Sequence, residues 1–235
     1  MRVHSFLNAF DVLLLDVNGT FMFGQDRFGP DQDYATTYRT LGGRTLSDGR
    51  VDELVGACIE RLTVVGRDST RDADFPSITE VLRETAAALE ADQFAFIARV
   101  IAAHELGMVP PSFAAALHVL AQNHRLVVVS NIWSEKAPWH RTFQEAGIED
   151  LFQAFIWSSD GHATKPAPEL FERAIAAAGV PRNRIAFVGD HPRRDIEGAV
   201  RVGLATVWID DGTRRPPSVS PGLTIGSLLE LTPAG

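Results

Sequence analysis

The stretch 10–21, FDVLLLDVNGTF, constrains the fold of this chain more than any other. Four apolar residues, Val12–Leu15, are followed by Asp16, and the chain then turns at residues 18–20, Asn-Gly-Thr. A short continuous apolar run closed by turn residues is typical of a fully buried strand in a parallel sheet. Ligands of open α/β sheets bind just beyond the carboxyl ends of the strands. Asp16 is therefore a candidate nucleophile or metal ligand, although alone it could equally start a turn.

The second half of the chain repeats this pattern with helices in between. Apolar runs at 126–129, 154–157, 185–188 and 205–209 alternate with segments of helical spacing that stop at Gly147, Gly179 and Gly203. Strands that alternate with helices predict a parallel sheet with right-handed crossovers. We expect Ser112 to cap the first of these helices and the Lys165-Pro166 pair to open the third.

The middle of the chain, residues 24–107, contains no convincing buried strand. Helical spacing of apolar residues predicts helices over about 51–65, 77–89 and 92–106, and Ser77 with Glu80 forms a capping box. The polar segment 66–75 is expected to be a loop. The predicted fold is thus an α/β, Rossmann-like parallel sheet built from residues 1–23 and 108–235, with an all-helical domain, 24–107, inserted after the first strand.

Polar side chains follow several of the predicted strands. Asp16, Ser130, Asp190 and Asp195 lie at or just past strand ends, and Lys165 stands at the start of a helix. Parallel strands bring such ends to one edge of the sheet, where converging carboxylates would repel each other unless a cation lay among them. Oxygen-only ligands favour Mg²⁺, which suits phosphate substrates. Each residue also has an ordinary structural explanation, but all of those explanations would have to coincide.

Composition excludes several classes of function. The formal net charge of −8 argues against broad binding of nucleic acid or anionic membranes, which need a basic face. Cys58 is the only cysteine, so an intrachain disulfide is impossible and a reducing compartment fits. The amino-terminal apolar run is too short for a signal peptide, and no segment is long enough to span a bilayer. We expect a cytoplasmic protein; its oligomeric state leaves no signal in the sequence.

Four short motifs in order resemble those of the haloacid dehalogenase-like hydrolase superfamily, most of whose members are Mg²⁺-dependent phosphatases. They are Asp-Val-Asn-Gly-Thr at 16–20, Val-Ser-Asn at 129–131, Lys-Pro-Ala-Pro at 165–168 and Gly-Asp-His-Pro-Arg-Arg-Asp at 189–195. The resemblance covers essentially the whole predicted core, and the helical insert lies where this family places a cap over its active site.

The resemblance implies a role for each matching residue. Asp16 would attack phosphorus to form an aspartyl-phosphate on a small phosphorylated metabolite, with Asn18 and Lys165 as the other catalytic residues. The phosphoryl group would be bound by Thr20, Ser130, Asn131 and Lys165. The cofactor would be Mg²⁺, held by Asp16, the backbone carbonyl of Asn18, Asp190 and Asp195.

Asn18 departs from the family pattern. Phosphatases of the family usually have a second aspartate there, which protonates the leaving group, and an amide cannot transfer a proton. The substrate would then carry a good leaving group, or another residue such as His191 would supply the proton. Alternatively, the chain binds Mg²⁺ and phosphate with little turnover. Carbon–halogen hydrolysis ranks last, because it needs no metal and would leave Asp190 and Asp195 without a purpose.

Overall fold

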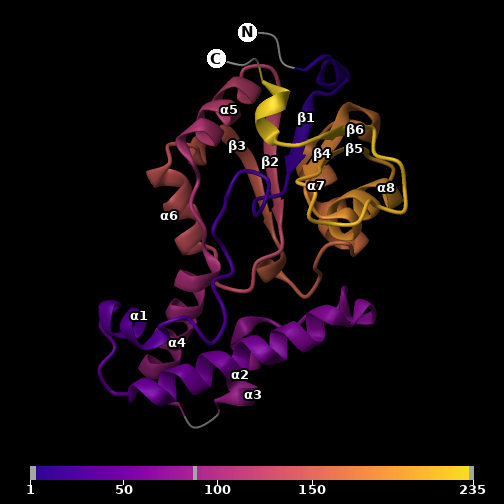
Figure 1. Ribbon diagram of the computed structural model, residues 1–235. Helices are drawn as coiled ribbons and strands as arrows, with labels where there is room; N and C mark the ends of the chain where they lie inside the picture. Colours follow the sequence, from indigo (N-terminus) through magenta and orange to yellow (C-terminus); the bar gives the residue numbers. More distant parts are fainter. Residues whose placement is uncertain (1–3, 87–88, 233–235) are drawn as a thin grey trace.

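The computed structural model describes residues 4–86 and 89–232. Its centre is a sheet of six parallel strands in the order β3-β2-β1-β4-β5-β6 (Figure 1). The strands are β1 Val12–Leu15, β2 Arg125–Ser130, β3 Phe152–Trp157, β4 Ile185–Gly189, β5 Ala205–Ile209 and β6 Leu223–Ile225. The predicted α/β fold is confirmed. The first strand lies between β2 and β4, so that Asp16 follows a central strand of the sheet.

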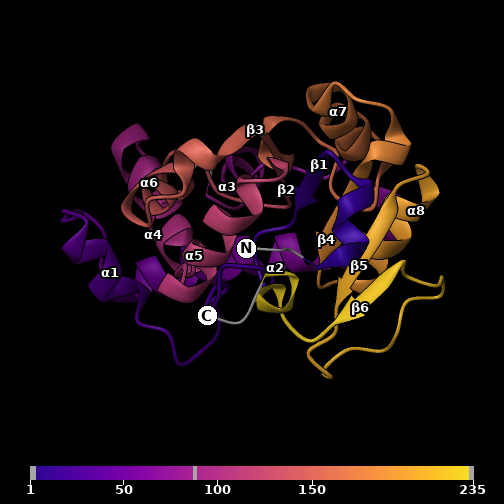
Figure 2. The same cartoon turned by 90° about the horizontal axis from the view of Figure 1, so that it is seen from above.

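Both faces of the sheet are buried, which explains why its strands are continuous apolar runs. All four residues of β1 are fully buried, with Leu13 and Leu15 on one face and Val12 and Leu14 on the other. Helices α5 (Pro111–Ala121) and α6 (Ala137–Glu145) cover the first face, and α7 (Pro168–Ala178) and α8 (Gly198–Arg201) cover the second (Figure 2).

The insert folds as helices around an apolar cluster of its own. These helices are α1 Tyr34–Thr40, α2 Asp48–Arg67, α3 Ile78–Thr85 and α4 Ala91–Glu105. The capping box of α3 is confirmed, because the Ser77 hydroxyl accepts the Glu80 N–H and the Glu80 carboxylate accepts the Ser77 N–H. The insert lies beyond one end of the sheet (Figure 1). The division into domains at residues 23 and 108 stays a prediction.

The two chain crossings between sheet and insert lie side by side. Phe23 and Met108 exchange two backbone hydrogen bonds, of 2.9 and 2.8 Å. The guanidinium of Arg27 then donates to the carbonyl oxygens of Gly24, Ala103 and Leu106, which ties the outgoing segment to the returning one. The chain therefore enters and leaves the insert at one paired connection.

Some elements differ from the sequence-based expectation. Helix α5 begins at Pro111 after Pro110, so Ser112 does not cap it, and proline suits this first helical position. Helix α2 continues to Arg67, which shortens the predicted loop. Before α8, the segment Pro192–Glu197 forms a π-helical turn. Short 3₁₀ turns cover Ser5–Ala9, Ser69–Arg71, Glu149–Leu151, Ser158–Asp160, Arg182–Arg184 and Leu228–Leu231.

Helix α1 and strand β6 were not expected from the sequence, since neither is long enough to show a clear period. Among the described residues, no helix combines the length and the apolar character needed to cross a membrane.

Candidate active site

The carboxylate of Asp16 lies at the carboxyl end of β1 and is 7% exposed. Its backbone N–H still pairs with the carbonyl of Val188 in β4, so the sheet fixes the position of the residue. Two donors meet on one carboxylate oxygen: Ser130 Oγ lies 3.0 Å and Lys165 Nζ 2.6 Å from Asp16 Oδ1. The strands and the loop before α7 thus bring together three residues that are far apart in the sequence.

Lys165 is almost completely buried and bridges two carboxylates. Its Nζ lies 2.6 Å from Asp16 Oδ1 and 2.8 Å from Asp195 Oδ1. The side chain of Asn131 holds the backbone at this point, accepting the Lys165 N–H at 2.8 Å and donating to its carbonyl at 3.1 Å. Burial alone would lower the pKa of Lys165, but the two carboxylates outweigh it and raise that pKa, so the ammonium is charged.

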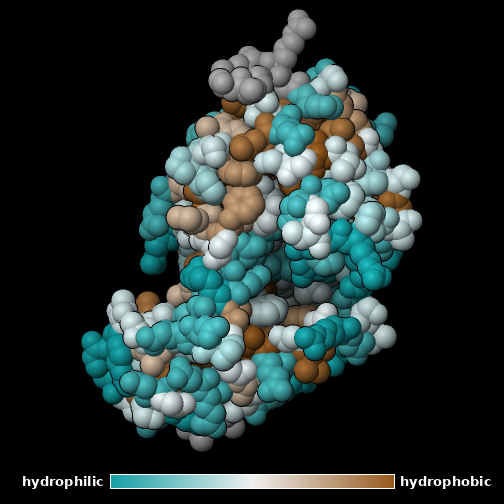
Figure 3. Space-filling view, viewed as in Figure 1, coloured by the Kyte–Doolittle hydropathy of each residue, from teal (hydrophilic) through white to brown (hydrophobic). Residues whose placement is uncertain are grey.

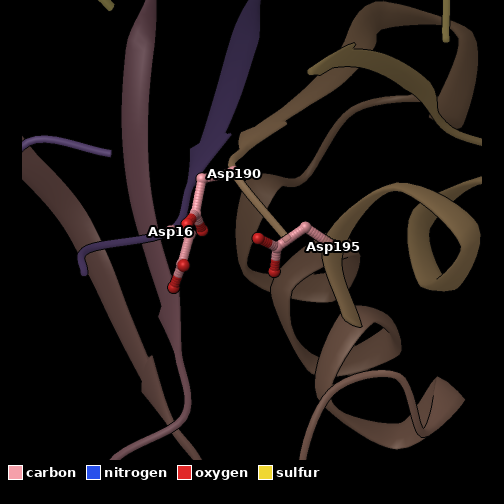
Figure 4. Close-up of side chains that lie close together, drawn as sticks. All are labelled: Asp16, Asp190 and Asp195. Atoms are coloured by element: carbon pink, nitrogen blue, oxygen red, sulfur yellow. The ribbon is translucent and has the colours of Figure 1, made fainter. Parts of the chain in front are cut away.

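Three carboxylates converge at this edge of the sheet. Asp190 directly follows β4, and Asp195 lies in the π-helical turn, where its Oδ2 accepts the N–H of His191 at 2.9 Å. One oxygen from each of Asp16, Asp190 and Asp195 lies within 4.8 Å of the others. Figure 4 shows Asp16 and Asp190 side by side, with Asp195 directed toward them from the helical side.

Two glycines make room for these carboxylates. Gly19 has a φ of +77°, and a Cβ placed there would lie 2.5 Å from Asp190 Oδ2. A Cβ at Gly189 would lie 2.5 Å from Asp195 Oδ2. The turn after β1 therefore needs glycine at position 19 both for its left-handed backbone and for the close approach of Asp190.

Burial and mutual repulsion disfavour the charged forms of Asp16 and Asp190. Burial raises the pKa of Asp16, an effect that Lys165 opposes and Asp195 reinforces. Burial, then Asp195 and Asp16, raise the pKa of Asp190 to about 7, although the Arg214 guanidinium opposes this. Arg214 comes from the segment after β5 and forms an ion pair with Asp190 Oδ2. Each of the three carboxylates is thus stabilised by cationic charge from Lys165 or Arg214, and a bound divalent cation would add to it.

The carboxylates of Asp16 and Asp190 open into a cavity of about 160 Å³ between the sheet edge and the insert. Figure 3 shows the corresponding hollow between the two parts of the molecule. Asp72, Phe75 and Glu105 of the insert contribute to its lining, together with Trp133 of the core. These residues give the cavity both aromatic and charged walls.

The insert is hydrogen-bonded to the core beside this cavity. The N–H of Thr164 donates to the carbonyl of Asp72 at 2.7 Å, and the N–H of Phe75 donates to the carbonyl of His162 at 2.6 Å. The carboxylate of Asp72 also forms an ion pair with Arg193. Since Thr164 directly precedes Lys165, these contacts hold the insert close to the carboxylate cluster.

The other predicted site residues, Asn18, Asn131 and Thr20, do not all line the same cavity. Asn18 lines the cavity, and its Oδ1 is buried without a hydrogen-bond partner among the described residues. Asn131 also lines the cavity, although its side chain is engaged by the backbone of Lys165. Thr20 is fully buried and instead lines a neighbouring cavity with Gly19 and Asp190. The roles assigned to these residues stay predictions.

His191, considered as an alternative acid, is not among the residues that line the cavity. Its Nδ1 accepts the N–H of Arg194 at 3.1 Å. Burial and the positive charges of Arg194, Arg214 and Lys165 lower its pKa to about 3. The ring is therefore neutral near pH 7 and has no labile proton to give to a leaving group.

Several charged residues of the cavity were not predicted from the sequence, among them Asp26, Asp72, Glu105 and Arg214. Glu105 ends α4, and its carboxylate accepts the N–H groups of Trp133 (2.6 Å) and Ser134 (2.9 Å), just past the second motif. Arg214 lies in an irregular segment after β5. A glutamate at the end of an amphipathic helix and an arginine in a loop carry no pattern that distinguishes them from surface residues.

The donor set fits a hard divalent cation. Carboxylates from Asp16 and Asp190 approach each other from adjacent strands, and oxygen ligands are those that Mg²⁺ prefers. The Oδ1 of Asn18, which has no hydrogen-bond partner in the described part of the chain, lies at the same edge. Asp195 is held by Lys165 and the backbone of His191, so it is suited to orient the lysine as well as to support a cation.

A family model for haloacid dehalogenase-like hydrolases matches residues 10–203. The chain is 39% identical to a phosphoserine phosphatase of Thermus thermophilus over 87 residues, which is 37% of this chain and 35% of that protein. It is 31% identical to the pyrimidine 5'-nucleotidase YjjG of Escherichia coli over 123 residues, 52% of this chain and 54% of that protein. The matched parts thus span only about a third and about half of these relatives.

Solved structures of the family share the fold over nearly the whole chain. A HAD phosphatase from Thermococcus onnurineus superposes with a TM-score of 0.63 at 24% identity, covering 94% of this chain and 95% of the other. A 2-haloacid dehalogenase from Pseudomonas syringae superposes with a TM-score of 0.63 at 19% identity, covering 94% and 96%. The chain belongs to the haloacid dehalogenase-like hydrolase family, and its relatives by sequence include phosphatases and a nucleotidase.

Proposed function

We propose that the chain is a Mg²⁺-dependent phosphatase that hydrolyses a small phosphorylated metabolite through an aspartyl-phosphate on Asp16. The observation that carries this proposal is the convergence of the Asp16, Asp190 and Asp195 carboxylates within 4.8 Å, with Lys165 bridging two of them. The phosphoserine phosphatase and the nucleotidase among the relatives support the same class of substrate. We keep the cytoplasm as the expected location.

In this proposal Asp16 acts as the nucleophile. A carboxylate oxygen would attack phosphorus, the bond from phosphorus to the ester oxygen would break, and water would then release inorganic phosphate from the aspartyl-phosphate. Lys165 and Ser130 both donate to Oδ1, so they orient the carboxylate and offset its charge. Mg²⁺, held by Asp16, the backbone carbonyl of Asn18 and Asp190, would offset charge on the phosphoryl oxygens.

The leaving group receives no proton from residue 18. General acid–base help is worth roughly 10²–10⁴ in rate, and an amide cannot provide it. His191 does not replace it, because its ring is neutral near pH 7 and is bonded to the Arg194 N–H. We therefore propose a substrate whose leaving group departs without protonation, such as an acyl or aryl phosphate.

Carbon–halogen hydrolysis is the second candidate, because Asp190 and Asp195 have partners in the structure that do not require a metal. Asp195 is paired with Lys165 and Asp190 with Arg214, so both acids have partners within the protein. In that reaction Asp16 would displace halide from carbon to form an ester, which water would hydrolyse. Neither a leaving-group acid nor a metal is needed for this step.

Phosphate release provides the test. Wild-type protein with Mg²⁺ is assayed on acetyl phosphate, p-nitrophenyl phosphate and alkyl phosphates, beside Asp16→Asn and the exposed-acid control Asp150→Asn. We expect wild type and the control to release phosphate and Asp16→Asn to release none. Intact mass after rapid quenching should show one added phosphoryl group in the first two proteins only.

Three outcomes would contradict the phosphatase proposal. Halide release from a 2-haloacid without Mg²⁺, and no phosphate release, would favour the dehalogenase. Binding of Mg²⁺ and phosphate with no phosphoryl-enzyme would favour a binding protein with little turnover. Retention of phosphatase activity by Asp16→Asn would place the nucleophile elsewhere.

A further inference from the structure

We propose that Arg214 is a built-in competitor for the divalent cation: its guanidinium holds the Asp190 carboxylate and must leave when Mg²⁺ binds there. This inference rests on the magnesium site of the proposed function. It concerns a residue outside all four motifs, and it gives the segment after β5 a role in setting metal affinity.

The ion pair involves the oxygen of Asp190 that lies nearer to the turn after β1. Arg214 Nη1 contacts Asp190 Oδ2. The position of a Cβ on Gly19 lies 2.5 Å from that oxygen but 3.4 Å from Oδ1, so Oδ2 is the atom nearer to the turn after β1. This turn carries Asp16 and Asn18. A cation shared between Asp16 and Asp190 would therefore use the same oxygen that Arg214 occupies.

A guanidinium and a divalent cation would repel each other at Oδ2. At a separation of a few ångströms in a site that is nine-tenths buried, the repulsion between the two positive charges is weakly screened. The Asp190 side chain is only 7% exposed, which makes one cationic partner necessary and two unfavourable. Binding of Mg²⁺ is thus coupled to release of Arg214.

The Arg214 guanidinium has space to move away from Asp190. The Arg214 side chain is 38% exposed, in contrast to the buried carboxylate that it contacts. It lies where two cavities meet, since it lines the active-site cavity and also the neighbouring one beside Gly19 and Thr20. The segment behind it is held by the side chains of Asp210 and Asp211, which accept backbone N–H groups at 3.0 and 2.9 Å. The side chain can therefore swing while its backbone stays in place.

Lys165 does not have this freedom. It is 2% exposed and lies within 2.8 Å of two carboxylates, so it stays in the site as a permanent cation. Of the two cations beside the described carboxylates, Arg214 is the one that can exchange with a metal.

The test measures the dissociation constant of Mg²⁺ by titration calorimetry, without substrate, for wild type, Arg214→Gln and Arg214→Lys. Arg215→Gln is the matched control, because Arg215 is the adjacent exposed arginine and lines neither of the two cavities. Loss of a charged hydrogen-bonded competitor should tighten Mg²⁺ binding by about 10-fold to 100-fold in Arg214→Gln. Arg214→Lys should lie between this variant and wild type, and the control should equal wild type.

Thermal unfolding with and without Mg²⁺ separates competition from a merely structural role. Arg214→Gln should have a lower Tm than wild type in EDTA, since Asp190 loses its partner, and should gain more from added Mg²⁺ than wild type does. Weaker or unchanged Mg²⁺ binding in Arg214→Gln would overturn the inference, as would equal behaviour of the two glutamine variants.

Failure of the proposed phosphatase function can be distinguished from failure of the Arg214 competition. If phosphate release requires Asp16 but never requires Mg²⁺, and neither wild type nor Arg214→Gln binds the ion, both proposals are wrong. If wild type binds Mg²⁺ and releases phosphate while Arg214→Gln binds the ion no more tightly, only the competition is refuted.

Discussion

Replacing Glu105 by glutamine should remove a pH dependence of stability that originates where the insert meets the core. Glu105 is 3% exposed, and its two oxygens accept the N–H groups of Trp133 and Ser134. Burial raises the pKa of this carboxyl to about 7, although the Ser134 and Trp133 donors oppose the shift. In the unfolded chain the ordinary value of 4.5 applies.

The direction of the effect follows from proton binding. Between pH 4.5 and about 7 the folded protein holds a proton on Glu105 that the unfolded chain has released, so the free energy of unfolding falls as pH rises. This stabilisation is fully present below pH 4.5 and is lost as pH rises through about 7. Each pH unit is worth about 1.4 kcal/mol, so the difference between 4.5 and about 7 amounts to about 3 kcal/mol.

Urea unfolding at pH 5, 6, 7 and 8 measures this contribution. The difference in unfolding free energy between wild type and Glu105→Gln is plotted against pH. Other titrating groups contribute equally to both proteins, so their effects cancel in this difference. One of them is His191, whose lowered pKa makes stability rise with pH. Glutamine provides one acceptor fewer for a buried N–H, which costs about 1–3 kcal/mol. This cost is the same at every pH, so it shifts the plotted difference without changing how that difference varies with pH. The exposed Glu145→Gln should keep the wild-type profile. Parallel curves for wild type and Glu105→Gln would refute the reasoning.

Three further outcomes are expected. Asn18→Asp should raise kcat on alkyl phosphates by about 10²–10⁴ and on aryl or acyl phosphates much less, because only poor leaving groups need the acid; equal gains would contradict the activated-substrate proposal. Leu14→Ala should lower the free energy of unfolding in urea by about 2–5 kcal/mol, since Leu14 is fully buried in the central strand. Gly19→Ala should weaken Mg²⁺ binding in calorimetry by displacing Asp190, whereas Gly179→Ala, with a φ of +65° but open space around its Cβ position, should lower only Tm.

The sheet and its carboxylates could be predicted because they depend on local sequence patterns. Val12–Leu15 form an uninterrupted apolar run, and such runs mark strands that are buried on both faces. In a parallel sheet the residues after such strands meet at one edge, so Asp16 and Asp190 could be placed together without knowing the strand order. The observed order sets their strands side by side.

The charged walls of the cavity could not be predicted, because they depend on how separate parts of the chain pack. Glu105 is buried only because the loop after β2 lies against the end of α4. Arg214 reaches Asp190 from a segment with no periodic pattern, and β6, three residues long, is too short to show one. Lys165, which was expected at this edge, and Arg214, which was not, are themselves cations among the carboxylates.

The paired crossing at Phe23 and Met108 makes the helical part a cassette that protein engineering can remove. Antiparallel residues that exchange two hydrogen bonds have Cα atoms about 5.5 Å apart, a span that an Asn-Gly hairpin turn closes. A shortened chain joined at this point would keep every strand and all three acids while opening the cavity to bulk water. Comparing it with the full chain would separate the chemistry of the sheet edge from the selectivity of its cover.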